Sequence, residues 1–425
     1  TDAMSFPRYP KYKDSGVEWL GQVPENWDVR PLKVVCSHND EVLDETTPPD
    51  AEIVYVDISG VDGVAGIKGK QQMPFSAAPS RARRKVRHGD VIISTVRTYL
   101  KAIARIENPE DNLIVSTGFA VVRPRRGIFA QFLGHLPFAS YFIEQVIARS
   151  TGVSYPAINA SDLVSIRVPV PSKAVQIQIA SFLDRETAKI DALIAEQQRL
   201  IELLKEKRQA VISHAVTKGL NPNVPMKPSG IEWLGDVPVH WEVKPLKQIV
   251  ATPITDGPHE TPQFIDEGVP FISAEAVSSG RIDFSKARAC ISAEDNARYS
   301  LKYSPKLHDI YMVKSGATTG VTAIVEDRTH FNIWSPLAVI RCGERAVPHF
   351  VLNFMRSKNF LEAIELNWSF GTQQNIGMGV IENLSCALPP LEEQARIAQF
   401  LERETAKLDI LTVEAQHAID LLQER

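Results

Sequence analysis

The chain is poor in cysteine and has no long hydrophobic run. Only Cys36, Cys290, Cys342 and Cys386 occur among its 425 residues, and no two of them form a Cys-x-x-Cys pair. Such scattered cysteines exclude a disulfide framework and a zinc site, and they are typical of a protein of the reducing cytoplasm. Because no apolar stretch approaches the roughly 18 residues that a transmembrane helix needs, we also expect no association with a membrane.

Signatures of catalysis and cofactor binding are also missing. Segment 63–70 superficially resembles a phosphate-binding loop, but its spacing differs from G-x-x-x-x-G-K-[ST], and Gln71 follows Lys70. The chain contains neither His-Glu-x-x-His nor Gly-x-Ser-x-Gly, and no spaced set of metal ligands. The Asn/Asp-Pro-Pro-aromatic tetrapeptide of amino methyltransferases and a nuclease set of carboxylates and lysine are absent as well. We therefore expect a chain that is not an enzyme and binds no cofactor or metal.

The most informative feature that is present is an internal repeat. Residues 15–33 return as residues 229–247, and both copies read Glu-Trp-Leu-Gly-x-Val-Pro-x-x-Trp. Farther along, residues 182–191 return as 400–409 with few changes. At this length each half can bury a core of its own, so we expect two homologous domains. Since the interiors between the shared borders differ, the repeat predicts one scaffold with two different binding surfaces.

Between the repeated borders, each half alternates short strand-like runs with loops. The runs are 53–58, 90–94, 119–123 and 164–168 in the first half, and 269–273, 309–313 and 337–341 in the second. Short helices are expected over 132–147 and 350–366. No alternating βαβ series appears, so the predicted fold class is α+β with mostly antiparallel sheets.

A long helix follows each interior, and both helices carry apolar residues at heptad spacing, which is typical of a coiled coil. The seam residues are Leu183, Ile190, Ile194, Ile201, Leu204 and Val211 in the first helix, and Leu401, Leu408, Ile419 and Leu422 in the second. Neither helix could cover its stripe on a globular unit alone. We therefore expect the two helices to pack antiparallel within the chain as a rigid spacer. Homodimerisation through the same stripe is the alternative.

These elements predict two homologous α/β domains separated by two long helices that form an antiparallel coiled coil. The predicted parts are a first domain at 4–172, a first helix at 173–219, a linker with the second domain at 220–390, and a second helix at 391–425. The second helix stops at Arg425, where the first continues through 209–218. We therefore expect the second helix to be shortened by about three turns.

Basic residues cluster in the first half although the net charge of the chain is −4. They lie just before and just after the strand predicted at 90–94. The candidate DNA contacts in this cluster are Arg81, Arg83, Arg84, Lys85, Arg87, Arg97, Tyr99 and Lys101. Guanidinium and ammonium groups neutralise phosphates, and arginine also pairs with guanine through two hydrogen bonds. The alternative is that the run is only a solvated face.

The second half carries a comparable set of different residues around the strand predicted at 309–313. These candidates are Arg298, Lys302, Tyr303, Lys306, Lys314, Ser315, Thr318 and Thr319. A polar loop near the end of each interior adds Ser154 and Tyr155 in the first half, and Thr372, Gln373, Gln374 and Asn375 in the second. Amide side chains pair with adenine, and hydroxyl groups contact phosphates. Simple polar turns are the alternative.

Taken in order, these motifs resemble the specificity subunit of type I restriction-modification systems. The resemblance rests on the repeated tryptophan block, the strands that begin at Asp90 and Asp309, the polar loops, and the Q-x-x-I-x-x-F-L-[DE]-x-E-T helix. It covers both halves, from Ser15 to Arg425. It implies that 24–171 and 238–389 are target recognition domains, each reading one half of a bipartite DNA sequence. The paired helices would set the gap between the two half-sites.

The resemblance also implies partners. Two methylation subunits would bind S-adenosylmethionine and methylate an adenine in each half-site. Two restriction subunits would use ATP and Mg²⁺ to translocate and cut double-stranded DNA. The missing methyltransferase and ATPase signatures agree with that division of labour and disfavour a self-sufficient restriction or methylation enzyme. The main alternative is a tandem-repeat coiled-coil scaffold that binds protein partners and never touches DNA.

Overall fold

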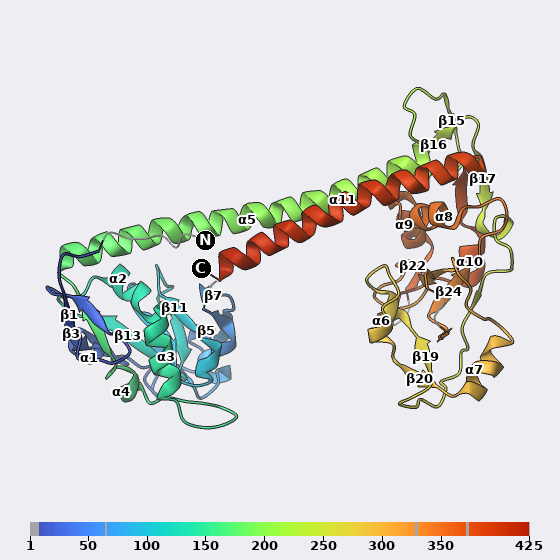
Figure 1. Cartoon of the computed structure of the whole chain (residues 1–425). Helices are drawn as coiled ribbons and strands as arrows, with labels where there is room; N and C mark the ends of the chain where they lie inside the picture. The colour runs from blue at the N-terminus through green and yellow to red at the C-terminus, as the bar shows by residue number, and fades with distance from the viewer. Residues whose placement is uncertain (1–7, 64–65, 328–329, 371–373, 425) are drawn as a thin grey trace. The chain divides into compact units, whose positions relative to one another are not determined.

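The computed structural model describes residues 8–63, 66–327, 330–370 and 374–424 (Figure 1). The chain divides into two compact units, Thr1–Leu193 (unit 1) and Ile194–Arg425 (unit 2). The division falls inside the long helix α5 (Lys173–Lys218), whereas the repeat predicted boundaries at the ends of that helix. None of the helices in the described ranges is long and apolar enough to cross a membrane.

Unit 1 is built around an antiparallel four-stranded sheet. Its strands, in spatial order, are β11 (Ile103–Arg105), β10 (Val91–Ser94), β13 (Phe119–Pro124) and β4 (Cys36–His38). Successive residues of a strand point to opposite faces of the sheet. Val91 and Ile93 pack toward α2 (Ala130–His135) and α3 (Ser140–Ala148), while Ile92 faces a second sheet. The sheet is therefore buried on both faces, which explains the continuous apolar run in β10.

The second sheet of unit 1 is mixed. It consists of β8 (Gln71–Pro74), β5 (Glu52–Val56), β12 (Leu113–Ser116) and β9 (Ala82–Lys85), in that order. Strands β5 and β12 are parallel, and the other neighbours are antiparallel. A two-stranded ladder of β3 (Asp28–Pro31) and β14 (Arg167–Val170) brings the two ends of the domain together.

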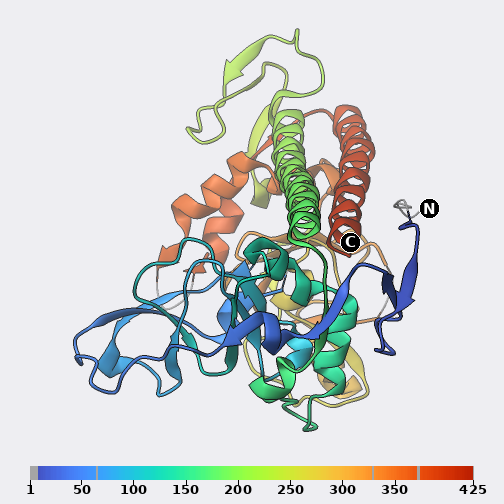
Figure 2. The same ribbon diagram turned by 90° about the vertical axis from the view of Figure 1, so that its left-hand side faces the viewer.

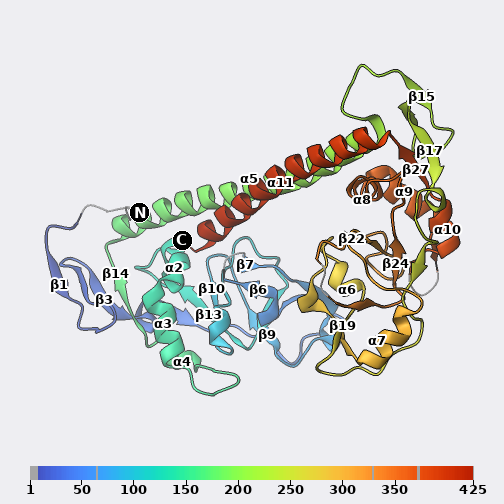
Figure 3. The ribbon, with the colours of Figure 1, turned by 45° about the vertical axis from the view of Figure 1, so that its right-hand side comes forward.

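Unit 2 repeats this plan. Its central sheet is β18 (Thr255–Asp256), β24 (Leu337–Ile340), β21 (Ile310–Val313) and β22 (Thr322–Ile324), and its second sheet is β20 (Ala289–Ile291), β19 (Val269–Ile272) and β23 (Asn332–Ile333). As in unit 1, one pair of the second sheet, β19 with β23, is parallel. Helices α8 (Pro348–Met355) and α9 (Lys358–Asn367) cover one face of the central sheet, and the second sheet lies on the other (Figure 3). The predicted α+β fold of two homologous halves is thus confirmed.

Each unit buries an aspartate just before or at the start of its central strand. The Arg123 guanidinium donates hydrogen bonds of 2.9 and 2.7 Å to Asp90, and Arg341 donates two of 2.7 Å to Asp309. Asp90 and Asp309 are 1% and 0% exposed. A buried carboxylate is costly unless it is paired, so the two arginines are needed to hold these strands together.

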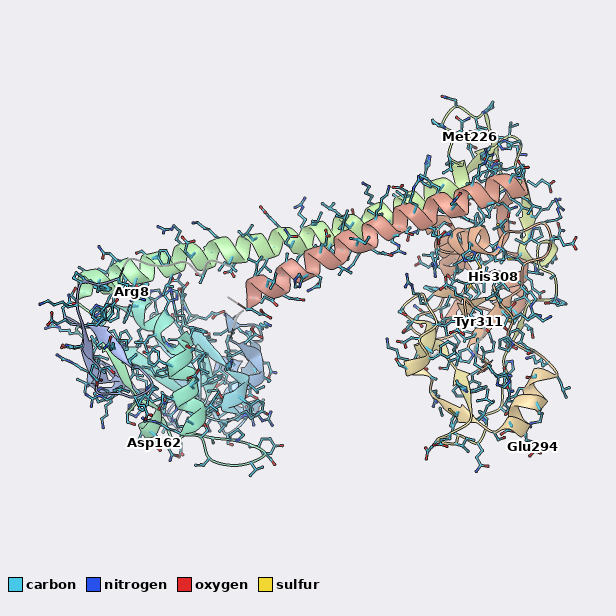
Figure 4. All side chains as sticks on the ribbon, viewed as in Figure 1. Arg8, Asp162, Met226, Glu294, His308 and Tyr311 are labelled. Carbon is cyan, nitrogen blue, oxygen red and sulfur yellow. The ribbon has the colours of Figure 1, made fainter. Side chains whose placement is uncertain are left out.

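The turn before each buried aspartate needs the left-handed backbone conformation. Gly89 has φ +86° in unit 1, and His308, labelled in Figure 4, has φ +67° in unit 2. Glycine adopts this conformation freely, whereas a residue with a side chain pays about 1–2 kcal/mol. The same turn is therefore kept in unit 2 at some cost in stability.

A buried glutamine anchors the start of each long helix. Gln176 and Gln394 are both 0% exposed. The side-chain oxygen of each accepts a hydrogen bond of 2.7 Å from a backbone N–H, that of Phe129 or Val347. The side-chain NH₂ donates to two backbone carbonyls in each case. This complete satisfaction explains why glutamine recurs in the repeated helix motif.

The long helices are α5 (Lys173–Lys218) and α11 (Leu391–Gln423). Within unit 2 the second half of α5 lies beside α11, and the two run antiparallel (Figure 2). Arg208 pairs with Asp409, and Ile201 clusters with Ile419. The antiparallel pairing predicted from the heptads is therefore confirmed for this unit.

Only some of the residues predicted to form the apolar seam of the two long helices are buried. Buried seam residues are Ile201, Leu204, Leu401, Leu408 and Ile419, and half-buried ones are Leu183, Ile190, Ile194, Val211 and Leu422. In the last turns of α5, Ile212 and Val216 enter the globular core of unit 2, and Val211 only borders it. An α-helix has 3.6 residues per turn, so an apolar seam of period 3.5 drifts around it unless a partner helix holds it.

Candidate nucleic-acid interface

In unit 1 the structure brings together two segments that are far apart in the sequence. Segment 95–101 follows β10, and segment 150–157 belongs to the loop that extends between α3 and α4 (Ala160–Leu163) in Figure 1. The N–H of Ile158 donates to the Thr95 carbonyl at 2.8 Å and joins the two. The candidates on these segments, which the sequence placed in separate groups, are Arg97, Tyr99, Lys101, Ser154 and Tyr155. We call these two segments the unit 1 loop pair.

The candidate side chains of the unit 1 loop pair are exposed, and its backbone is strained. Tyr99 is 53% and Tyr155 64% exposed. The Arg97 guanidinium lies 4.9 Å from the centre of the Tyr155 ring. Arg97 and Lys101 have φ of +51° and +50°, which costs about 1–2 kcal/mol for a residue with a side chain. Strain of this kind gathers at functional sites, because there geometry matters more than stability.

The basic run 81–87 is distributed along β9 and its ends instead of gathering at one point. Arg81 pairs with Asp57 at 2.7 Å, and Arg87 pairs with Glu41 beyond the other end of the strand. An arginine that already pairs with a carboxylate gains less from a phosphate. The sequence alone could not reveal these pairings, because both acidic partners lie more than twenty residues away.

The middle of the run is also engaged within the protein. The Arg83 guanidinium lies 4.9 Å from the Phe75 ring centre and donates to the Ala82 carbonyl. Arg84 is half-buried, burial lowers its pKa, and its Nε has no hydrogen-bond partner among the described residues. Lys85 is exposed. Contacts of Arg83 or Arg84 with DNA would therefore require these side chains to rearrange.

Unit 2 repeats the loop arrangement with different side chains. The N–H of Ile376 donates to the Lys314 carbonyl at 2.9 Å, matching the contact between Ile158 and Thr95 in unit 1. The candidates on this unit 2 loop pair, formed by 314–320 and 374–376, are Lys314, Ser315, Thr318, Thr319, Gln374 and Asn375. The candidates Thr372 and Gln373 lie outside the described residues. The two loop pairs thus share a backbone framework and differ in chemistry.

A buried aspartate with three basic neighbours lies beside the unit 2 loop pair. Asp256, 5% exposed, lies 2.6 Å from Lys302, 3.1 Å from Lys314 and 3.0 Å from His259. Burial by itself raises the pKa of this carboxyl, but hydrogen bonds from the two lysines outweigh burial and lower the pKa. Both lysines are thus held by an internal carboxylate. His259 is a neighbour that the sequence gave no reason to select.

One predicted DNA contact is wrong. Tyr303 is 6% exposed, and its hydroxyl donates to Asp309 at 2.7 Å and bonds to the Tyr311 hydroxyl. Burial, together with Tyr311 and Asp309, raises the pKa of Tyr303. Figure 4 places Tyr311 inside unit 2. Tyr303 belongs to this core, so it cannot meet a ligand at the surface.

Besides Lys302, two further candidates before β21 remain at the surface. Arg298 is exposed, donates to Asp295 at 2.7 Å and pairs with Glu260 at 2.8 Å. Lys306 is exposed, and its backbone N–H donates to Asp309. Arg298 therefore has local acidic partners, and Lys306 is the more open of the two cations.

An aromatic surface near the unit 2 loop pair was not predicted. The Arg288 guanidinium lies 4.7 Å from the Trp334 ring centre and 5.7 Å from that of Phe264. Trp334 precedes β24, and the nearby Pro336 carbonyl accepts from the Lys314 N–H at 2.8 Å. Aromatic rings and guanidinium planes are surfaces on which bases stack. Only the isolated tryptophan between two predicted strands could have signalled this cluster.

A cleft of about 1420 Å³ opens beside the unit 2 loop pair. Thr319 and Gln374 line it together with Arg208 of α5, Glu402 of α11 and Arg356, which follows α8. Side chains of both charge signs therefore face it. Within the described ranges, no group of three His, Cys, Asp or Glu side chains is placed to hold a metal ion.

Comparison with known proteins identifies the family. The model of the type I restriction modification DNA specificity domain matches residues 24–203 and again residues 238–419. The chain is 27% identical over 306 residues to the type I restriction enzyme EcoKI specificity subunit of Escherichia coli (strain K12). That alignment covers 70% of this chain and 63% of the relative, so the chain spans less than two thirds of that protein's length.

Two further comparisons extend over nearly the whole chain. The putative type I restriction enzyme MjaX specificity subunit of Methanocaldococcus jannaschii is 24% identical over 90% of this chain and 88% of its own length. The crystal structure of the HsdS subunit from Thermoanaerobacter tengcongensis has a TM-score of 0.52 at 26% identity and covers 95% and 96% of the two chains. A chain from a structural study of type I R-M system assembly has a TM-score of 0.70 at the same identity and coverage. Since the family model matches both halves, the chain belongs to the family of the type I restriction modification DNA specificity domain and carries two copies of it.

Proposed function

We propose that this chain is the non-catalytic DNA-recognition subunit of a type I restriction-modification complex and binds a bipartite target in double-stranded DNA. The observation that carries the proposal is that the unit 1 loop pair and the unit 2 loop pair share one backbone arrangement. Both units hold their loops with the same backbone contact, Ile158 to Thr95 and Ile376 to Lys314. Their exposed side chains differ, as two unlike half-sites would require.

Unit 1 and unit 2 would each read one half-site. Cations would position the DNA through its phosphates, and loop side chains would read the base edges. Unit 1 offers Arg97 and Lys101 for phosphates, and Tyr99 and Tyr155 as exposed aromatics. Unit 2 offers hydroxyl and amide groups, which suit hydrogen bonding to base edges.

The proposed partners are two methylation subunits and two restriction subunits. Those subunits would bind S-adenosylmethionine, ATP and Mg²⁺, and the helices α5 and α11 would space the half-sites and receive partners. Apolar side chains remain exposed on these helices after they pair in unit 2: Leu200, Leu203, Leu411 and Val413 are 41%, 51%, 46% and 68% exposed. Large apolar side chains that stay exposed on a helix are available to a further partner.

Selection from a pool of random duplexes tests the proposal. The full chain, with and without methylation subunits of a type I system, should enrich duplexes that share a split motif with a fixed gap. Replacing residues 24–171 by the corresponding segment of a relative should change one half-site and leave the other unchanged. Enrichment of no motif would contradict DNA recognition, and a change in both half-sites would contradict one unit per half-site.

A further inference from the structure

We infer that unit 1 reads its half-site partly through an apolar contact, in which Val153 touches the 5-methyl group of a thymine in the major groove. This contact presupposes the proposed function and specifies the chemistry of one half-site within it. It concerns a residue that the charge and amide patterns did not select.

Val153 stands out by its exposure. Its side chain is 102% exposed, more than that of any other large hydrophobic residue in the part of the chain that the structure describes. An apolar side chain that gains nothing from the protein core is available for an outside partner. Burying one methylene or methyl group against that partner contributes about 0.8 kcal/mol.

The loop presents Val153 in a defined way. Thr151 and Ala157 exchange two backbone hydrogen bonds of 2.9 Å and close the loop at its base. Gly152 has φ +107°, and a Cβ there would lie 3.1 Å from the Tyr155 carbonyl oxygen. The glycine therefore allows the sharp turn that directs Val153 outward. A loop that is closed at its base loses less conformational entropy on binding.

The charges around the loop indicate that its partner is DNA. Segments 95–101 and 150–157 contain two cations, Arg97 and Lys101, and no carboxylate, although the whole chain has a net charge of −4. A cationic rim with an apolar tip suits an anionic ligand that also presents apolar groups. In the major groove, the thymine 5-methyl is the apolar group that a side chain can contact.

Tyr155 and Val153 are the two large apolar side chains of segment 150–157, and the Tyr155 ring already contacts Arg97. Val153 is therefore the freer of the two. The Arg97 guanidinium covers one face of the Tyr155 ring at 4.9 Å. The matching backbone contacts pair Ile158 with Ile376, and at the same spacing the sequence of unit 2 has Gly371 where unit 1 has Val153. Glycine has no side chain, so we expect dependence on a thymine methyl through this position only in the half-site of unit 1.

The test uses the full chain and the duplex that it enriches from a random pool. Each thymine of the enriched duplex is replaced in turn by uracil, which removes only the 5-methyl group. In the unaltered chain, one replacement within one half-site should weaken binding about fourfold, as expected for one buried methyl group. In Val153→Ala, the affinity for the thymine duplex should fall by a similar factor, and uracil at that position should have no further effect.

Val239→Ala is the matched control, because Val239 is 50% exposed and lies in unit 2. It should keep the full difference between thymine and uracil. Since Val153 has no burial to lose, its replacement leaves folding intact, and equal binding of both variants to random duplex checks this. Retention of every uracil effect in Val153→Ala would overturn the inference, as would an enriched target whose thymine methyls contribute nothing. Failure to enrich any sequence would instead overturn the proposed function itself.

Discussion

Arg341 holds the completely buried carboxylate of Asp309 with two hydrogen bonds of 2.7 Å. The Asp309 carboxylate raises the pKa of Arg341, so this guanidinium stays charged throughout the working pH range. The same relationship joins Arg123 to Asp90 in unit 1. An ion pair that recurs in two units with divergent loops belongs to the shared scaffold.

Arg341→Leu should strongly destabilise unit 2. It leaves Asp309 buried without its cation, and breaking a buried pair in this way costs about 3–5 kcal/mol. Urea unfolding, with hydrogen exchange to assign the transition to unit 2, measures the loss. Arg345→Leu is the control, because Arg345 is 59% exposed in its pair with Glu242, and such pairs contribute at most about 1 kcal/mol. Similar losses in the two variants would contradict a scaffold role for the buried pair.

Gln394→Leu should loosen the start of α11. The leucine fills a similar volume but leaves the Val347 N–H and two carbonyls without their partner, and each unsatisfied buried group costs about 1–3 kcal/mol. A drop of at least about 2 kcal/mol in the unfolding free energy of unit 2 is expected. Gln416→Leu, at an exposed position of the same helix, should change stability little. Hydrogen exchange should show that Gln176→Leu has the corresponding effect in unit 1 and spares unit 2.

The acid stability of unit 2 should depend on the lysines around Asp256. In the folded chain these lysines lower the pKa of Asp256, so its contribution is present above the unfolded value of about 3.9 and is lost as pH falls through the lower folded value. In Lys302→Met/Lys314→Met, burial should instead raise the pKa of Asp256. The contribution of Asp256 to folding stability is then present below its unfolded pKa, and it is lost as the pH rises through the raised folded pKa.

Unfolding of unit 2 as a function of pH measures this reversal. The double variant should be less stable than the unaltered chain at neutral pH, and the difference should shrink as the solution is acidified. Lys306→Met, at an exposed position nearby, serves as the control. A constant difference at all pH values would show that the lysines do not act through Asp256.

Lys101→Ala should weaken binding to all duplexes alike. Lys101 is exposed, and no carboxylate pairs with it among the described residues. Loss of one phosphate contact should make the slope of log affinity against log salt concentration shallower by about 0.9. Lys68→Ala, which removes an exposed lysine that pairs with Asp62 at 2.9 Å, should leave the slope unchanged. An unaltered slope for Lys101→Ala would remove this lysine from the phosphate contacts.

Much of the scaffold could be predicted because it is repeated. The tryptophan block and the helix motif recur in both halves, and local apolar periodicity is sufficient to predict strands and long helices. The antiparallel pairing of the helices followed from two matching apolar stripes within one chain. The drift of the seam near Ile212 could not be predicted, since it depends on which globular surface covers the last turns of α5.

The binding surfaces were predicted less well. The sequence presents Arg81 and Arg87 as free cations, because only folding brings Asp57 and Glu41 near them. Tyr303 lies close to Asp309 in the sequence, but its burial depends on how the chain packs around Tyr311. The sequence gives no reason to select Val153, because a lone valine in a polar loop carries no periodic signal. Exposure is a property of the folded chain.

The sequence by itself determined that the chain holds two copies of one α+β unit with long helices, because repeats and periodicity are local patterns. Only the tertiary structure decided which loops meet, since the contacts of Thr95 with Ile158 and of Lys314 with Ile376 join segments more than sixty residues apart. It also decided which charged side chains form ion pairs within the protein. Burial and pairing depend on distances in space, and these arise only when the sheets have formed.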